Sequence, residues 1–209
     1  MKTIVIKNND LSYAVEVLLS GGLVGVPTET VYGLAGNGLD AGAVARIYEV
    51  KGRPAVKPLS LLVPDLEVAA TVCAGIPKAA RVLAEAFWPG PLTIVLPKRN
   101  TVPHIVTAGG DTIGVRCPDH PKTLQLLRLA KVPLAAPSAN LSDQQSPKSA
   151  EEVLAYFDGK INCIIDGGRC KLGVESTIVS LVTSSCKILR QGALSEEEIR
   201  NALGSSGQV

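Results

Sequence analysis

The sequence predicts a mixed α/β fold, in which a twisted sheet is flanked by helices. Short apolar runs such as Gly22–Val26 alternate with segments whose apolar residues recur every three to four positions, as expected for buried strands and amphipathic helices. Several expected strands follow one another with no helix between them, so a mixed sheet fits better than a strictly doubly wound one. Since the chain has no internal repeat and no linker, we expect a single domain over residues 1–209.

The composition is that of an ordered protein with an aliphatic core. Hydrophobic residues make up 46% of the 209 residues but aromatic residues only 3%, so Val, Leu, Ile and Ala must fill the interior. The formal net charge of +2 indicates by itself neither a nucleic-acid binder nor a membrane-surface protein. Any basic site must therefore be local.

The five cysteines and two histidines argue against metal or disulfide chemistry. The cysteine count is odd and no C-x-x-C pair occurs, so incidental thiols in a reducing compartment are the better interpretation. The N-terminus lacks the apolar region of a signal peptide, and no run approaches the roughly 18 apolar residues of a membrane span. We expect a soluble cytoplasmic protein with no membrane contact and no metal held by protein side chains.

The first expected element is a short strand, Thr3–Ile6. Asp10 can then cap a helix, because apolar residues follow it at helical spacing and Gly21 can end it. Gly22–Val26 is a second strand, apolar on both faces as in a buried sheet. A small polar turn, PTETVYG at 27–33, comes next.

Two helices and two strands follow this turn. A helix is expected over Asp40–Val50, and a strand over Leu59–Val63. The next helix is Pro77–Phe87, with Pro77 at its first position, where a missing N–H costs nothing. Leu92–Leu96 is the following strand.

The second half begins with a strand, Thr112–Arg116, and a helix, Pro121–Ala130. Pro133–Ala136 is a short strand that leads into the sequence PSAN at 137–140.

The last elements are marked by two capping boxes. Ser149 with Glu152 starts a helix to Tyr156, and Ser195 with Glu198 starts a short final helix. Three strands are expected between these helices: Ile161–Ile165, Thr177–Leu181 and Lys187–Arg190.

Polar side chains gather at the ends of the expected strands, where open α/β sheets place their ligands. They are Thr28, Thr30, Arg116, Ser138, Asn140, Ser176 and Arg190. Singly, each is more often a turn former or a solvated charge. Together, five cations could serve one cleft and suit a polyphosphate: Lys51, Arg53, Lys57, Arg116 and Arg190. Neither standard phosphate-loop motif, G-x-x-x-x-G-K-[ST] or G-x-G-x-x-G, is present.

Eight segments resemble the YrdC/Sua5 family, the L-threonylcarbamoyladenylate synthases that start the t6A modification of tRNA. They occur in the family's order and cover most of the chain. The segments are PTETVYGL (27–34), KGRPAVKPLSLL (51–62), WPGPLT (88–93), TIGVRCPDHP (112–121), APSANLS (136–142), DGG (166–168), ESTIV (175–179) and LRQG (189–192). The chain matches the family's short form, which is the catalytic domain alone.

The resemblance implies a single YrdC-like domain with a concave basic cavity. It also implies the reaction, in which ATP, L-threonine and bicarbonate or CO2 give threonylcarbamoyl-AMP and diphosphate, with Mg2+ accompanying ATP. Cationic clamps and the metal would stabilise the negative charge without a protein nucleophile. The implied partners are a downstream threonylcarbamoyl transferase complex and, through a direct contact, tRNA.

Motif positions imply two sets of binding residues. The ATP set is Lys51, Ala55 through its backbone, Thr112, Ser138, Ser146 and Arg190. The threonine set is Thr28, Ser60, Arg116, Ala136 through its backbone and Ser176, with Arg116 a candidate for the carboxylate. Lys51, Arg53 and Arg116 are the candidate catalytic residues, and Tyr32, Lys57 and Asn140 are further cavity candidates.

Two other functions stay open at this point. One is a carbamoyl-transfer module like that of hydrogenase-maturation proteins, although the chain has no C-x-x-C pair. The other is a double-stranded RNA-binding module, since a concave basic surface attracts a phosphate backbone. The small net charge and the few aromatic residues weaken the second alternative.

Overall fold

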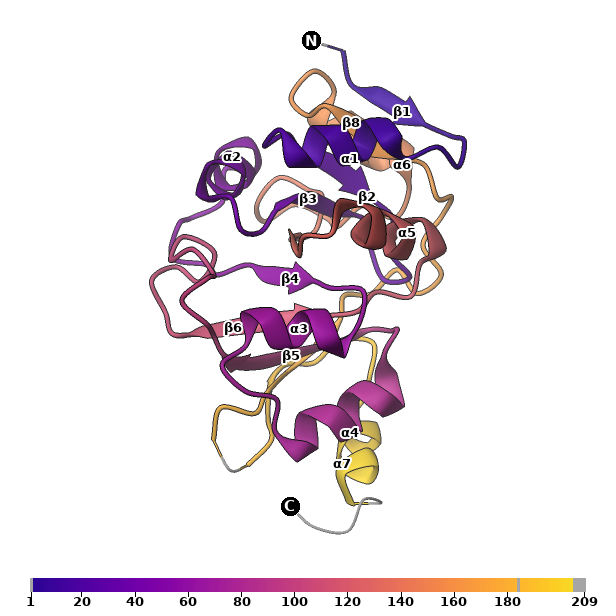
Figure 1. The fold of residues 1–209 in the computed structure, drawn as a ribbon. Helices are drawn as coiled ribbons and strands as arrows, with labels where there is room; N and C mark the ends of the chain where they lie inside the picture. The colour runs from indigo at the N-terminus through magenta and orange to yellow at the C-terminus, as the bar shows by residue number, and fades with distance from the viewer. Residues whose placement is uncertain (1, 184, 205–209) are drawn as a thin grey trace.

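The computed structural model describes residues 2–183 and 185–204 and has the expected mixed α/β architecture (Figure 1). Within these residues one ten-stranded sheet has the order β1-β8-β2-β3-β7-β4-β6-β5-β9-β10. Its strands are β1 (Ile4–Ile6), β2 (Val24–Val26), β3 (Gly33–Asn37), β4 (Ser60–Leu62), β5 (Leu92–Pro97), β6 (Thr112–Arg116), β7 (Leu134–Ala135), β8 (Cys163–Ile165), β9 (Thr177–Ser180) and β10 (Lys187–Arg190).

Seven helices flank the sheet in the part of the chain that the structure describes. They are α1 (Ser12–Leu19), α2 (Ala41–Lys51), α3 (Leu66–Val72), α4 (Lys78–Phe87), α5 (Pro121–Ala130), α6 (Ala150–Phe157) and α7 (Glu196–Gly204). In Figure 1 the helices α1, α5 and α6 lie at the end of the molecule that holds β1, β8 and β2. At the other end α3 lies over β6 and β5, and α4 packs against α7.

The sheet is mixed because it contains both parallel and antiparallel pairs of neighbouring strands. β1, β8 and β2 are parallel to one another, and so are the pairs β4–β6 and β5–β9. The other neighbouring pairs are antiparallel: β2–β3, β3–β7, β4–β7, β5–β6 and β9–β10. The prediction of a mixed sheet is therefore confirmed.

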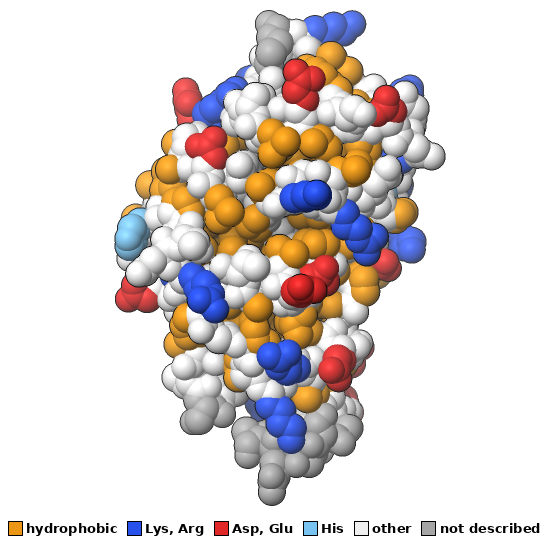
Figure 2. All heavy atoms as spheres, in the orientation of Figure 1, with side chains coloured by type: hydrophobic (Ala, Val, Ile, Leu, Met, Phe, Trp, Pro, Cys, Tyr) orange, Lys and Arg blue, Asp and Glu red, His pale blue; other side chains and the backbone are white. Residues whose placement is uncertain are grey.

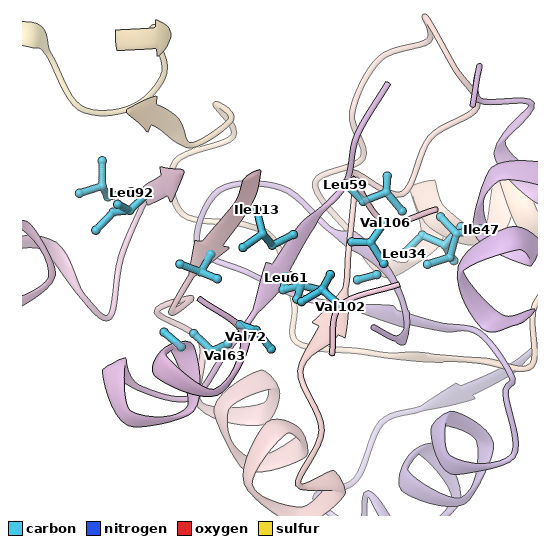
Figure 3. Packing of buried hydrophobic residues seen from close by; sticks show 14 of the residues in the cluster. Leu34, Ile47, Leu59, Leu61, Val63, Val72, Leu92, Val102, Val106 and Ile113 are labelled. Carbon is cyan, nitrogen blue, oxygen red and sulfur yellow. The ribbon is translucent and has the colours of Figure 1, made fainter. Parts of the chain in front are cut away.

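Successive strand residues point to opposite faces and so feed two hydrophobic clusters. Leu34 and Leu61 belong to the larger cluster, whose packing Figure 3 shows, while their neighbours Ala35 and Leu62 belong to the smaller one. α1 and α5 cover the smaller cluster, with Leu18 among its fully buried members. As expected, both cores are almost wholly aliphatic.

Two elements were missed by the sequence-based prediction. The PTETVYG segment was expected to be only a turn, but its last residue begins β3, whose sequence GLAGN carries no β-branched residue. Tertiary packing selects this strand: a Cβ at Gly36 would lie 3.0 Å from a methyl carbon of Leu23. α3 was also missed, although Asp65 caps it by accepting a hydrogen bond from Val68 N at 2.8 Å.

The structure corrects the expected start of three helices by one residue, among them α2, which begins at Ala41 with Asp40 as its N-cap. The first helix begins at Ser12 with Leu11 as its N-cap. Asp10 lies one residue before the N-cap, and its side chain accepts a hydrogen bond from Ser12 N at 3.0 Å. Pro77 is the N-cap of α4 rather than its first residue. Such shifts are within the usual uncertainty of helix ends.

The two expected capping boxes differ in detail. The Ser195–Glu198 box is complete, with Ser195 N donating to Glu198 Oε2 at 2.7 Å and Glu198 N donating to Ser195 Oγ at 3.2 Å. In the other box Ser149 Oγ accepts from Glu152 N at 3.4 Å, but the Glu152 carboxylate accepts from Lys148 N instead of from Ser149 N. The Glu152 side chain therefore reaches one residue further back than a standard box.

All five cysteines are free thiols. None of the described helices combines the length and apolarity that a bilayer crossing requires. On the face drawn in Figure 2, the Lys and Arg side chains are interspersed with acidic and apolar ones.

Candidate active site

A cavity of about 390 Å3 brings together most of the predicted site residues. They come from separate segments of the chain. The predicted residues that line it are Thr28, Tyr32, Lys51, Arg53, Lys57, Ser60, Arg116, Ala136, Ser138, Asn140, Ser146, Ser176 and Arg190. Five of these are cations, whereas two lining residues, Asp143 and Glu175, are carboxylates.

The floor of the cavity is formed by neighbouring strands. Ser60 and Leu62 of β4 line it, while Leu61 between them faces the larger core. Gly114 of β6 pairs with Ser60, and a Cβ at this glycine would lie 2.7 Å from Ser60 Oγ. A residue without a side chain therefore keeps the floor open at this point.

Lys51 stands at the C-terminus of α2, where a cation is favoured by the helix dipole. Gly52 ends the helix in the left-handed conformation with φ of 58°. The Lys51 side chain is buried, and its Nζ donates to the carbonyl oxygens of Ser138 and Asn140. Burial, helped by the nearby Arg53, lowers the pKa of Lys51 to about 8, and Glu175 acts in the opposite direction.

Arg116 ends β6 and is paired with a carboxylate that the sequence-based prediction missed. Its Nη2 donates to Glu29 Oε1 at 2.7 Å and to Thr30 Oγ1 at 2.9 Å, and both charged side chains are buried. Its Nε donates to Gly90 O at 3.1 Å. Burial lowers the pKa of Arg116, and the Glu29 carboxylate opposes that shift. Its Nη1 makes no hydrogen bond within residues 2–183 and 185–204.

Glu175 is the second carboxylate that the prediction missed. Its Oε2 accepts from Arg190 Nη1, and its Oε1 accepts from Ser146 Oγ at 3.0 Å. Arg190 is also tied to Ser176, since its Nε and Nη2 donate to the Ser176 carbonyl oxygen at 3.1 and 2.8 Å. One carboxylate thus joins two residues of the predicted ATP set.

The basic loop between α2 and β4 is braced by Arg53. Its Nε donates to Lys57 O at 3.1 Å and its Nη2 donates to Pro58 O at 3.0 Å. Burial lowers the pKa of Arg53. Lys57 pairs with the exposed Asp143 at 3.4 Å. A pair this exposed contributes little to stability.

The turn after β2 is closed by its own hydroxyl groups. Thr28 Oγ1 donates to Val31 O at 2.6 Å and lies 2.8 Å from Thr30 Oγ1. Tyr32 OH donates to Gly168 O at 2.8 Å and accepts from Gly167 N at 3.1 Å, and burial raises the pKa of this phenol. The predicted DGG segment therefore packs against the turn.

Asn140 and Ser142 leave polar atoms unpaired beside the cavity. Asn140 Nδ2 donates to Leu141 O at 2.7 Å and to Gln144 O at 2.8 Å. Among the described residues, no partner is found for the buried Asn140 Oδ1 or Ser142 Oγ. Such unpaired polar atoms are available to form hydrogen bonds with a bound ligand.

Two predicted ATP contacts, Ala55 and Thr112, are not among the residues that line the cavity. Ala55 is exposed in the loop between Arg53 and Lys57. Thr112 begins β6, on the strand face shared with Gly114 and Arg116.

The missed residues Glu29 and Glu175 lie inside motifs that the sequence already displays, PTETVYG and ESTIV. The signal that could have found them is chemical. A carboxylate is the usual companion of a buried arginine, and several arginines were expected in one cleft.

The described residues hold no group of three or more His, Cys, Asp or Glu side chains that could bind a metal ion. The donors in the cavity are hydroxyls, carbonyls and two carboxylates already paired with cations. Mg2+ commonly keeps several waters and is bound through substrate phosphates and one or two carboxylates. This donor set fits a metal that enters with a nucleotide.

Comparisons of the sequence and of the structure with known proteins point to the same family. The family model Sua5_yciO_yrdC, described as "Telomere recombination", matches residues 16–192. A threonylcarbamoyl-AMP synthase of Pyrococcus abyssi is 50% identical over 184 residues, which cover 88% of this chain and 54% of the relative. One of Bacillus subtilis is 42% identical over 195 residues, covering 93% and 56%.

A solved structure, that of P. abyssi Sua5 complexed with L-threonine, superimposes with a TM-score of 0.93 at 46% identity. The match covers 98% of this chain and 61% of that one. The chain spans about half the length of these two curated relatives and of a third, from Schizosaccharomyces pombe.

Proposed function

Because this chain belongs to the Sua5/YciO/YrdC family, we propose that it is a threonylcarbamoyl-AMP synthase. In the proposed reaction the amine of L-threonine takes up CO2, supplied directly or from bicarbonate, and forms a carbamate. A carbamate oxygen then attacks the α-phosphate of ATP. The bond between the α- and β-phosphates breaks, diphosphate leaves, and threonylcarbamoyl-AMP remains as the donor for t6A modification of tRNA.

One observation carries this proposal: a single cavity gathers cations and hydroxyls from motifs that are far apart in the sequence. The cations suit a triphosphate, and the hydroxyls with one buried arginine suit a small amino acid. No protein nucleophile is required, because the substrates supply the attacking oxygen and the leaving group. Catalysis then consists of positioning and of stabilising charge.

The threonine end of the cavity is proposed around Arg116. Its Nη2 is held by Glu29 and Thr30, which leaves Nη1 for the threonine carboxylate. The other members of the proposed threonine set also line the cavity: the hydroxyls of Thr28, Ser60 and Ser176 and the backbone of Ala136. Buried hydrogen-bonding groups of this kind discriminate strongly against analogues that lack a partner.

The ATP end is proposed around Lys51, Arg53 and Arg190, with the hydroxyls of Ser138 and Ser146 beside them. Lys51 Nζ uses two of its three N–H groups on carbonyl oxygens, and the third can reach a phosphate. Tyr32, Lys57 and Asn140 complete the wall. Ala55 and Thr112, which do not line the cavity, are proposed as peripheral ATP contacts.

Mg2+ is proposed to enter with ATP and to neutralise charge on the phosphates. The protein's own part is to hold the triphosphate with cations, to present the carbamate to the α-phosphate and to keep water away. The last point matters because an adenylate exposed to water would hydrolyse.

The proposed partners follow from the chemistry of the product. Threonylcarbamoyl-AMP is an activated mixed anhydride, so a threonylcarbamoyl transferase complex must consume it, and tRNA is the final acceptor. A direct contact with tRNA is part of the proposal. The five free thiols support a reducing compartment such as the cytoplasm.

The proposal is tested by incubating the protein with ATP, L-threonine and bicarbonate and identifying the products by mass spectrometry. Threonylcarbamoyl-AMP and diphosphate, formed only when all three substrates are present, are expected. Carbamoyl-AMP would instead favour the carbamoyl-transfer module. Salt-sensitive RNA binding without ATP consumption would favour the RNA-binding module.

A further inference from the structure

Glu175 places a carboxylate among the cations of the proposed ATP site. Its side chain is 39% exposed, and its two oxygens accept from different residues of the proposed ATP set. Oε2 accepts from Arg190 Nη1, and Oε1 accepts from Ser146 Oγ at 3.0 Å. A phosphate that bound Arg190 and Ser146 would accept hydrogen bonds from the same two groups, Arg190 Nη1 and Ser146 Oγ, that now donate to Glu175.

Arg190 is also anchored by a residue other than Glu175. Its Nε and Nη2 donate to the Ser176 carbonyl oxygen, and Nη2 also donates to Ser176 Oγ at 3.1 Å. Only Nη1 is directed to Glu175. The carboxylate is therefore not needed to aim the guanidinium, and its main effect is to occupy the edge that an anion would use.

The field of Glu175 reaches two more cations of the site. It raises the pKa values of Lys51 and Arg53, against the larger effect of burial on each. The second carboxylate of the cavity, Asp143, lies in a more solvated position than Glu175. It is 82% exposed and pairs with the exposed Lys57. Solvent screens such a surface pair.

We propose that Glu175 competes with polyphosphate for Arg190 and Ser146 and so lowers the affinity of the cavity for ATP and diphosphate. The inference rests on the proposed function, because it takes the triphosphate of ATP as the ligand. Like charges in one cavity repel, and each anion displaces the other from shared donors. The benefit to an enzyme is faster release of diphosphate, at the expense of tighter substrate binding.

Isothermal titration calorimetry on the Glu175→Gln variant tests this inference. Glutamine keeps the shape and the acceptor oxygen but removes the charge. The titrants are ATP and inorganic diphosphate, without threonine or bicarbonate, so that no turnover occurs. Titrations at pH 7, with and without Mg2+, keep Lys51 protonated, since its pKa is about 8.

Both ligands should bind Glu175→Gln about tenfold more tightly than wild type. A change of this size is expected when one repulsive unit charge, partly screened by solvent, is removed from the site. The matched control is Asp143→Asn, which removes the other carboxylate of the cavity and should change either dissociation constant less than about twofold. Glu175→Asp, which keeps the charge but draws it back from Arg190, should give a smaller tightening. Melting temperatures verify that each variant folds.

Three results would overturn the inference while leaving the proposed function intact. Unchanged affinity would mean that Glu175 does not compete. Weaker binding only with Mg2+ would make Glu175 a metal ligand, and weaker binding in both conditions would make it a direct contact of the nucleotide. Wild-type protein that binds neither ATP nor diphosphate would remove the proposed ATP site itself, and the inference with it.

Discussion

Arg116 and Glu29 form a buried ion pair, with Nη2 and Oε1 2.7 Å apart and side chains 9% and 4% exposed. Glu29 Oε2 accepts from Asp119 N at 3.0 Å, so both of its oxygens are used. The pair joins the turn after β2 to the end of β6. By holding Nη2 it fixes the guanidinium, whose Nη1 we assign to the threonine carboxylate.

Glu29→Gln should therefore weaken threonine binding and leave ATP binding nearly unchanged. The amide can still hydrogen-bond to Arg116 but cannot hold it with charge, so Nη1 is aimed less well. We expect the KM for threonine to rise by about tenfold, equivalent to roughly 1.4 kcal/mol. Steady-state kinetics with each substrate varied in turn measures this, and an equal rise in both KM values would contradict the assignment.

Lys51 gives the proposed ATP site a pH dependence in the mildly alkaline range. Its pKa is lowered from 10.5 to about 8, mainly by burial. Only the protonated amine attracts phosphate, so ATP affinity should fall as pH rises through about 8. ATP also raises the pKa of Lys51, so binding near pH 8 should take up protons. Calorimetry in buffers of different ionisation enthalpy measures that uptake.

The same shift has the opposite consequence for stability. Between about pH 8 and 10.5 the unfolded chain holds the Lys51 proton while the folded chain does not, so the contribution of Lys51 to stability increases with pH in that window. Lys51→Met removes both effects. Retention of the proton uptake in this variant would show that another group titrates.

Gly114 tests the floor of the cavity. In Gly114→Ala the new Cβ would lie 2.7 Å from Ser60 Oγ and 3.1 Å from a methyl carbon of Thr93, so Ser60 must shift. Because Ser60 belongs to the proposed threonine set, we expect at least about a tenfold loss of kcat/KM for threonine, and overpacking typically costs about 1–3 kcal/mol of stability. Gly75→Ala is the matched control, since no atom lies within 4 Å of the added Cβ. Wild-type kinetics from Gly114→Ala would place threonine elsewhere.

The sequence predicts the architecture better than it predicts the contacts inside the site. Apolar runs and caps identify nearly all elements, because local spacing determines which face is buried. β3 could not be found in this way, since its glycines are chosen by close packing against Leu23 and not by strand propensity.

The same limit applies to the site. Motifs indicate which cations belong together, and 13 of the predicted residues line the cavity. The pairing of Arg116 with Glu29 and of Arg190 with Glu175 depends on chain segments 87 and 15 residues apart meeting in space. Sequence spacing contains no such information for a long-range pair.

Lys51→Ala and Arg116→Ala should both abolish diphosphate release that depends on ATP and threonine, but they should differ in stability. The sequence motifs alone lead to the expectation that both variants keep the fold. In the structure, Arg116→Ala leaves the Glu29 carboxylate buried without its cation, which typically costs about 3–5 kcal/mol. Lys51→Ala instead leaves two carbonyl oxygens with one partner fewer, about 1–3 kcal/mol at most.

Chemical denaturation of the two variants distinguishes these costs, and the double variant Glu29→Gln/Arg116→Met separates charge from packing. Methionine fills much of the arginine volume, and glutamine removes the orphaned charge, so this double variant should recover most of the stability lost in Arg116→Ala while staying inactive. If it were as unstable as Arg116→Ala, the loss would come from packing and not from the uncompensated carboxylate. Diphosphate release at the wild-type rate from either single variant would refute the catalytic assignment of that residue.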